Sequence, residues 1–380
     1  MNRAMQARGG AAMRLRGLVR KEFYQILRDP SSIAIAFLMP VVLLLIFGYG
    51  VSLDADHVPV AIVADQPDAD TASFTNAFAN TRYFQPLLLP SMREAKAALM
   101  AGEVNGIVHL RADFARRLHG SEGAPIQVIV NGVDANTGRI VIGYAQGVWA
   151  SWLQQLARSR GEDLKLPVQL EQRVWYNSEL RSRNFLVPGL IAIIMTLIGA
   201  LLTALVMARE WERGTMEALM VTPVTIRELL IGKLIPYFIL GMGGMGLSVL
   251  MALFLFEVPL RGSLLLLAAA SSLFLLVALA MGLLISIAAK NQFVAGQVAI
   301  IVTFLPAFIL SGFIFDIGSM PGVIQALTHV IAARYFVAIL QTIFMAGNVW
   351  PVILPNALAL AVMALILFAV IQRRAHKRLE

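Results

Sequence analysis

Six long intervals without Asp, Glu, Lys or Arg dominate this sequence of 380 residues. A lone charge at the centre of a bilayer costs at least about 2.5 kcal/mol, and a helix needs about 20 apolar residues to cross one. The intervals lie between residues 29 and 54, 183 and 209, 233 and 257, 261 and 290, 290 and 316, and 334 and 373. Each can hold such a helix. The pattern predicts an α-helical integral membrane protein with six transmembrane helices.

Composition agrees with this class. Hydrophobic residues make up 58% of the chain and charged residues only 14%, whereas soluble domains are about one-quarter charged. The absence of cysteine excludes disulfides, thiolate metal sites and cysteine nucleophiles. A net charge of +8 is compatible with nucleic-acid binding, but Lys and Arg also collect on the cytoplasmic side of membrane proteins. The position of the charges along the chain decides between these two explanations, and we expect no nucleic-acid partner.

Charge also predicts the orientation. Residues 1–31 carry seven Lys and Arg against two acids, residues 373–380 carry four against one, and residues 54–183 carry thirteen against fourteen. The basic tails should be cytoplasmic and the large segment outside, which needs an even number of crossings. A cleaved secretory signal is not expected, because both the leading segment and the first apolar stretch are long for one.

These boundaries divide the chain into eleven segments. We expect an amphipathic cytoplasmic helix (1–31), the first span (32–53), an inserted extracytoplasmic α/β domain (54–183), the second span (184–208), a cytoplasmic coupling loop or helix (209–229), the third, fourth and fifth spans (230–256, 263–289, 292–315), extracytoplasmic or re-entrant helices (316–348), the sixth span (349–372) and a basic cytoplasmic tail (373–380). Before the first span, apolar residues such as Leu15, Leu18 and Phe23 share one helical arc. This segment either lies on the membrane surface as a helix or only anchors the topology, and Asp29-Pro30 ends it.

The segment 54–183 alternates short β-like runs with helical stretches. The runs are Val58 to Ala64, Gly106 to Leu110 and Ile126 to Val130, the helical stretches lie around 70–79, 91–101 and 135–157, and a half-buried strand is expected at Val168 to Tyr176. This alternation predicts a compact α/β domain that folds independently. It could bind substrate, bind a partner or brace a dimer.

Two loops have candidate roles. In 209–229, Pro223 should end a short helix, and Thr225 with Glu228 fits a capping box that starts the next. The short helix has good geometry to transmit force from a cytoplasmic partner, and the alternative is a solvated loop. The segment 316–348 has helical periodicity interrupted by Pro321, Gly322 and Arg334. It either dips into the outer leaflet, where it could gate an exit path, or forms an amphipathic surface pair.

Several kinds of chemistry are absent from the sequence. There is no phosphate-binding G-x-x-x-x-G-K-[ST] loop, no hydrolase or zinc motif and no metal-ligand spacing among the five histidines. Glycines 241, 243, 244 and 246 indicate close helix packing. Lys233, near the end of a span, can snorkel to the surface, and no span interior carries Asp or Glu for ion coupling. We therefore expect no catalytic site and no cofactor, and an energy source on another polypeptide.

Four blocks of sequence resemble the membrane subunits of type-2 ATP-binding-cassette (ABC) permeases, in the bacterial branch with a large domain after the first helix. They are KEFYQILRDP (21–30), RVWYNSELRSRNFLVPGL (173–190), REWERGTMEALMVTPVTIRELLIGK (209–233), and SMPGVIQAL with ARYFVAILQTIFMAG (319–327 and 333–347). The likeness runs nearly end to end. In the second block the family pattern has proline where this chain has Ser178, so a local change in loop geometry is expected.

The resemblance implies a coupling helix that docks on a separate ATPase subunit, which holds ATP and Mg. The residues that match it are Glu210, Glu212, Arg213, Gly214, Thr215, Glu217, Thr222 and Pro223, with Lys21, Glu22, Arg28 and Asp29 of the N-terminal helix as a second contact. It further implies a pair of permease copies, identical or closely paralogous, in the bacterial inner membrane among lipid. Members export drugs or other amphipathic compounds, often with a periplasmic adaptor protein.

Three functions follow from these patterns. The first is ATP-driven export through two such chains, of a drug-like, amphipathic or lipid-like substrate. The second is a non-transporting membrane receptor or assembly scaffold whose external domain binds a partner. A passive channel is the third, although no span shows the polar stripe of a water-filled pore.

Reversing one charge on the expected coupling helix tests the first function. We predict that Glu217→Arg separates the chain from its ATPase and stops transport while membrane insertion is retained. Co-purification of the ATPase and transport assays measure this. Unchanged assembly and transport would remove Glu217 from the contact.

Overall fold

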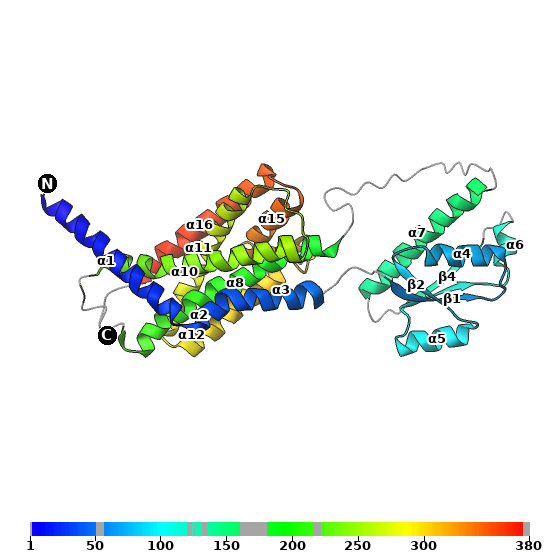
Figure 1. The fold of residues 1–380 in the computed structure, drawn as a ribbon, viewed down its shortest axis with the longest axis horizontal. Helices are drawn as coiled ribbons and strands as arrows, with labels where there is room; N and C mark the ends of the chain where they lie inside the picture. The colour runs from blue at the N-terminus through cyan, green and yellow to red at the C-terminus, as the bar shows by residue number, and fades with distance from the viewer. Residues whose placement is uncertain are drawn as a thin grey trace. The chain divides into compact units, whose positions relative to one another are not determined.

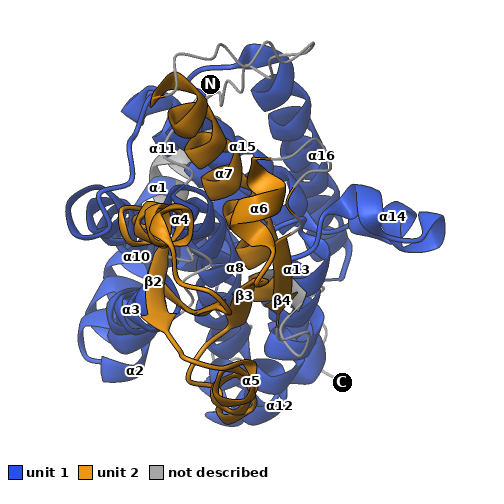
Figure 2. Cartoon of the chain, turned by 90° about the vertical axis from the view of Figure 1, so that its right-hand side faces the viewer, with its two compact units in different colours: residues 1–52, 174–380 blue, residues 53–173 orange. Residues whose placement is uncertain are grey.

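The computed structural model describes residues 2–50, 57–119, 124, 126–130, 135–159, 181–215, 222 and 224–374. The chain divides into two compact units, shown in Figure 2: residues 1–52 with 174–380, and residues 53–173. We call them the membrane unit and the inserted unit, and each is described by itself.

The membrane unit is all helical. Its elements are α1 (Asn2–Leu27), α2 (Pro30–Ile33), the π-helical η1 (Ala34–Leu38), α3 (Met39–Gly50), α8 (Ser182–Glu212), α10 (Ile226–Leu250), π-helical η2 (Met251–Leu255), α11 (Leu264–Ala289), α12 (Gln292–Ala299), π-helical η3 (Ile300–Phe304), α13 (Leu305–Leu310), the 3-10 turn η4 (Ile317–Ser319), α14 (Gly322–Thr328), α15 (Ala332–Met345) and α16 (Trp350–Arg374). Six helical stretches are long and apolar enough to cross a membrane: Pro30–Gly50, Ser182–Glu212, Ile226–Leu255, Leu264–Ala289, Gln292–Leu310 and Trp350–Arg374. About six spans are thus confirmed.

Helix α8 is the central helix of this unit (Figure 1). It contacts α3, α10, α11, α12 and α15. In its most apolar stretch of 18 residues 94% of the residues are buried, against 17–50% in the corresponding stretches of the other five spans. Small residues bring α11 close to it: a methyl group on Gly199 would collide with Ala278, and one on Gly282 with the carbonyl of Ala200. Such small residues let helix backbones approach in membranes, where hydrophobic burial alone does not drive association.

Proline explains two of the three π-helical segments. Proline lacks an N–H group, and its ring clashes with the carbonyl four residues earlier. Pro40 follows η1 and Pro306 follows η3, so each clash falls inside the π-helical turn. The wider turn accommodates the ring without breaking the span. The third segment, η2, instead ends its helix with a bond from the Phe256 N–H to the Met251 carbonyl.

Between the fifth and sixth spans the chain forms a bent helix pair. Helices α14 and α15 meet at 80°, and together they are apolar enough for a broken span or a re-entrant loop. Arg334 at the bend donates hydrogen bonds to Thr328 and to the Gln325 carbonyl, and Tyr335 donates to the His329 carbonyl at 2.8 Å. These bonds give hydrogen-bond partners to backbone carbonyl groups at the sharp bend, which favours a rigid connection between α14 and α15.

The inserted unit contains a four-stranded sheet covered on both faces. Its elements are β1 (Val58–Ala64), α4 (Ala69–Ala79), β2 (Phe84–Leu88), α5 (Met92–Ala101), β3 (Gly106–Leu110), α6 (Phe114–Leu118), β4 (Ile126–Val130) and α7 (Ala135–Ser159). The strand order is β2-β1-β3-β4, with β4 antiparallel to β3 and the other pairs parallel. Figure 1 shows α5 on one face and α4 with α7 on the other. Alternate residues of β1 accordingly enter two cores, Val60 and Ile62 beneath α4 and α7, and Ala61 and Val63 beneath α5.

Most predicted elements lie within a few residues of the observed ones. Three strands coincide with the predicted runs, and the N-terminal helix ends before Asp29-Pro30, as predicted, although the next helix begins at Pro30 rather than at 32. The strand β2 was missed, because Pro86 interrupts its pattern; β2 lies at the sheet edge, where a strand tolerates proline. The second span extends beyond its predicted end at 208 to Glu212, since its last charged residues remain helical. The predicted strand Val168 to Tyr176 lies outside the described residues.

Two glycines on α10 provide a matched test of helix packing. A methyl group on Gly244 would overlap the carbonyl oxygen of Ala36 in η1, whereas one on Gly246 would meet nothing within 4 Å. Gly244→Ala should therefore destabilise the protein by about 1–3 kcal/mol through overpacking. Gly246→Ala should be neutral or slightly stabilising. Thermal unfolding of both variants in mild detergent measures the difference, and equal melting temperatures would contradict the close contact.

Candidate functional site

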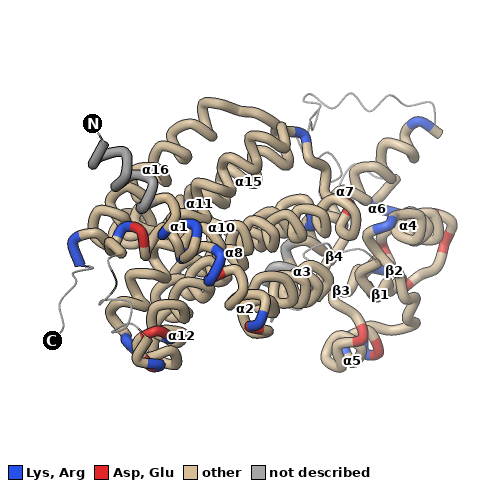
Figure 3. Tube along the Cα trace, turned by 60° about the vertical axis from the view of Figure 1, so that its left-hand side comes forward, with Lys and Arg blue, Asp and Glu red and all other residues tan. Residues whose placement is uncertain are grey.

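Charged residues of the membrane unit gather where α1, the end of α8, the start of α10 and the end of α16 lie together (Figure 3). We call this region the charged end. The described ends of the loop that joins α8 to α10, residues 213–215 and 224–225, lie here. Both helices that lead into the loop carry buried charges here, Glu210 on α8 and Lys233 on α10.

The N-terminal helix α1 packs along α10. A methyl group on Gly232 would meet the Leu18 Cβ at 2.9 Å, so the absence of a side chain lets the two helices touch. Arg14 Nη2 lies 2.8 Å from Glu228 Oε1. Glu228 also completes the predicted capping box, because Thr225 accepts from the Glu228 N–H and Glu228 accepts from the Thr225 N–H. The first turn of α10 is thus fixed by its own cap and by α1.

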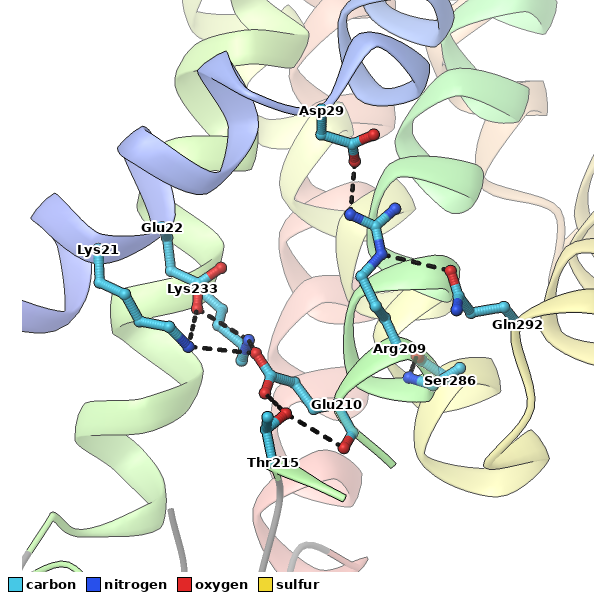
Figure 4. Close-up of polar contacts among 10 residues, drawn as sticks. Lys21, Glu22, Asp29, Arg209, Glu210, Thr215, Lys233, Ser286 and Gln292 are labelled. Atoms are coloured by element: carbon cyan, nitrogen blue, oxygen red, sulfur yellow. Dashed lines mark hydrogen bonds and ion pairs between the residues drawn. The ribbon is translucent and has the colours of Figure 1, made fainter. Parts of the chain in front are cut away.

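Four charged residues form the centre of the site, and we call them the ion quartet: Lys21, Glu22, Glu210 and Lys233 (Figure 4). Lys233 Nζ lies 2.9 Å from both Glu22 Oε1 and Glu210 Oε1. Lys21 Nζ lies 3.5 Å and 3.3 Å from the same two oxygens. The side chains of Glu22, Glu210 and Lys233 are 1–5% exposed, and that of Lys21 is 45% exposed. Three helices therefore meet at a quartet with two positive and two negative charges.

Because the quartet is buried, each of its buried charges depends on its counter-ions. An ion removed from water loses several kcal/mol of solvation, which only a close counter-ion and hydrogen bonds restore. Lys233 serves both carboxylates, and Glu22 Oε2 has no hydrogen-bond partner among the described residues. A movement of α1 away from α8 would separate Glu22 from the buried Lys233, which would then keep only Glu210 as a counter-ion. The three helix segments are thus expected to move together.

A second ion pair joins the first and second spans. Arg209 Nη1 lies 2.5 Å from Asp29 Oδ2, and Arg209 Nε lies 3.3 Å from Gln292 Oε1 at the start of α12. Glu212 in turn accepts hydrogen bonds from the backbone and side-chain amides of Gln292. The entry of span 1, the end of span 2 and the start of span 5 are therefore connected by polar side chains at one level of the bundle.

Asp29 remains ionised at this position. Partial burial raises the pKa of its carboxyl group, but hydrogen bonds from Ser31, Arg209 and Ser32 and the charge of Arg209 outweigh burial and hold the pKa well below its usual range. Because the folded-state pKa is lowered, the stabilisation is present above the unfolded value of about 4 and is lost only as the pH falls through the folded value. Near neutral pH the Asp29–Arg209 pair is thus insensitive to pH.

The chain turns sharply after α8. Gly214 has a φ of +66°, a left-handed conformation that suits glycine and commonly ends helices. Thr215 then donates a hydrogen bond to the Glu210 carboxylate, which ties the first loop residues to the ion quartet. The start of the loop is therefore a fixed continuation of α8.

The residues predicted as ATPase contacts have different environments in the structure. Glu22 and Glu210 are buried, Asp29 is paired within the chain, and Lys21 is partly exposed in the quartet. Arg28, Glu212, Arg213, Gly214 and Thr215 are exposed, and Thr222 is partly buried. Glu217 and Pro223 lie outside the described residues. The matched residues thus divide into an internal group and a group at the surface.

The sequence interpretation of Lys233 was wrong. Snorkelling was expected for this side chain, but the structure buries it between Glu22 and Glu210. Arg209 was also missed as a functional residue, together with its partner Gln292. One signal was available, because Glu210 and Lys233 have opposite charges on either side of the loop that joins α8 to α10. Glu22, 211 residues from Lys233, could not be assigned to them from sequence spacing.

The fold and this site define a class: a multi-pass membrane protein whose central helical hairpin is tied to an amphipathic N-terminal helix. Within the described residues no group of His, Asp or Glu side chains could hold a metal ion. The chain belongs to the ABC-2 family of transporter proteins, whose family model matches residues 30–371.

Three relatives in Escherichia coli K12 have informative names. The chain is 46% identical to the "Probable multidrug ABC transporter permease YbhS", over 97% of this chain and 98% of that protein. It is 30% identical to the "Probable multidrug ABC transporter permease YbhR", with coverage of 90% and 95%. It is 27% identical to the "Inner membrane transport permease YhhJ", with coverage of 84% and 85%. The comparisons support a membrane-embedded permease subunit of the inner membrane over a receptor or scaffold, and family membership implies an ATPase partner.

Removal of the shared cation tests the ion quartet. Lys233→Met leaves two buried carboxylates beside one partly exposed lysine, so we predict a loss of about 3–5 kcal/mol in the free energy of unfolding. Lys21→Met removes the exposed cation and should cost at most about 1 kcal/mol. Denaturant unfolding in detergent measures both changes.

A double variant separates charge from packing. Adding Glu22→Gln to Lys233→Met restores a balance of one positive and one negative charge, and it should recover part of the lost stability. No recovery would show that the lysine acts through its packing rather than its charge.

Proposed function

We propose that this chain is the permease subunit of an ATP-driven exporter, powered by a separate ATPase subunit that binds ATP and Mg. The observation that carries this proposal is the ion quartet. It joins α1, α8 and α10 at the base of the loop that, by resemblance, contacts the ATPase. A force applied to the loop would reach all three helices at once.

The two groups of matched residues have different roles in this proposal. Arg28, Glu212, Arg213, Gly214 and Thr215 are exposed. By resemblance, Glu212, Gly214, Thr215, Glu217, Thr222 and Pro223 would face the ATPase, with Arg28 and Arg213 at the edge of that surface. Lys21, Glu22, Glu210 and Asp29 instead transmit the movement, since their carboxylate and ammonium groups are engaged within the chain. Closure of the ATPase dimer on ATP would displace the loop, and the quartet would carry the displacement into α8.

Helix α8 is suited to receive this movement. It is the most buried span and contacts the helices of spans 1, 3, 4 and 5 as well as α15, so its displacement must repack the bundle. Packed helices have few alternative arrangements, and a ligand that favours one of two states shifts the population between them. Two copies of the chain would in this way alternate between inward and outward access.

The positive charge of both tails supports a cytoplasmic charged end. With six crossings, the inserted unit would then lie on the opposite side, where an adaptor protein could dock. Exposed apolar side chains on the outer spans can face lipid or a second permease copy. The names of two relatives and the scarcity of ionisable groups in the spans favour a drug-like, amphipathic or lipid-like cargo, taken from the cytoplasm or the inner leaflet.

Purification of the tagged chain in mild detergent tests the proposal. We expect a stoichiometric ATP-binding subunit to co-purify and to hydrolyse ATP, because the charged end presents a fixed surface to it. A clean chain without an ATPase, under conditions that preserve related complexes, would contradict the proposed function.

A further inference from the structure

A basic cleft lies at the charged end, beside the ion quartet. Its charged lining residues are Lys21, Arg28, Asp29, Arg209 and Arg213, and Gln292 is among its polar ones. Four of these residues are cationic and one is anionic. They come from α1, the start of span 1, the end of span 2 and the start of span 5, so the fold brings distant parts of the chain to one site.

The four cations differ in how far they are neutralised. Lys21 is paired with Glu22 and Glu210, and Arg209 is paired with Asp29. The guanidinium groups of Arg28 and Arg213 make no ion pair or side-chain hydrogen bond with any other described residue. Both residues are exposed. Among the described residues, the cleft therefore has two cations without an ionic partner, and each can bind an anionic group with bidentate hydrogen bonds.

The position of the cleft favours a lipid as the source of that anion. Asp29 immediately precedes span 1, and Gln292 begins span 5, so the cleft lies where apolar spans give way to charge. Spans 1 and 5 pack on the same part of α8, through Ile35 and Met39 of span 1 and Ala295 of span 5. Large apolar side chains next to the cleft are exposed, among them Ile33 at 37% and Phe293 at 72%.

From these observations we propose that the cleft binds the phosphate of an anionic phospholipid, with Arg28 and Arg213 as its principal ligands. The acyl chains would lie over Ile33 and Phe293, along the line where spans 1 and 5 meet. Basic pockets between helices at a membrane surface bind such headgroups, whereas single basic residues at span ends only set topology. The bound lipid would link α1 to the end of α8 from outside the ion quartet.

Lipid binding to the purified full-length chain tests this site without an ATPase, so its outcome is independent of the proposed function. Native mass spectrometry would follow titration with dioleoyl-phosphatidylglycerol, dioleoyl-phosphatidylcholine or inorganic phosphate. We expect preferential binding of phosphatidylglycerol, and a loss of about tenfold in its affinity in Arg28→Gln/Arg213→Gln. The matched control is Arg373→Gln/Arg374→Gln, which removes the same charge from exposed positions on α16 outside the cleft and should leave binding unchanged.

Four results would overturn the proposal. They are equal losses in the two double variants, equal binding of the two lipids, displacement of phosphatidylglycerol by millimolar inorganic phosphate, and unchanged lipid binding in a cleft variant that loses the ATPase. The last result would assign Arg28 and Arg213 to a carboxylate on the partner protein. If the double glutamine variant does not fold, Arg28→Lys/Arg213→Lys keeps both charges but not the bidentate geometry, and it should bind phosphatidylglycerol with intermediate affinity.

Discussion

The contact of one ammonium group with two carboxylates fixes the arrangement of the membrane unit at its charged end. Lys233 reaches Glu22 on α1 and Glu210 on α8 at equal distances, and all three side chains are almost fully buried. None of these charges is favourable without the others, since each has lost its water. The amphipathic helix is therefore bound to the bundle by charge as well as by the contact of Leu18 with Gly232.

This constraint makes the contacts between helices at the charged end different in kind from those within the membrane. Within the membrane, α8 packs through small residues and apolar side chains, which give close contact but little directional preference. At the charged end, polar contacts are directional, and they connect spans 1, 2, 3 and 5 to the N-terminal helix. The loop between α8 and α10 thus begins and ends on fixed supports, a suitable arrangement for a coupling element.

Local features of this fold could be predicted from the sequence, whereas the site could be predicted only in part. The spans could be predicted from the charge-free intervals. The Thr225–Glu228 capping box depends only on residues close in sequence, and the packing at Gly241, Gly243 and Gly244 depends on residue size. In contrast, the burial of Lys233 depends on Glu22, 211 residues away, and no spacing rule connects them. The resemblance pointed to the region where these charged residues gather, but it could not separate internal residues such as Glu22 from exposed ones such as Arg213.

The length of α8 has a consequence for how the protein responds to its bilayer. Its 31 residues span about 46 Å, whereas the hydrocarbon core of a bilayer is about 30 Å thick. A long helix that faces lipid can tilt to hide the excess, but α8 is enclosed by its neighbours and cannot tilt alone. Changes in bilayer thickness would therefore act first on the outer spans, which face lipid. They would reach α8 only through a collective tilt of the bundle, so the whole membrane unit would respond to membrane thickness.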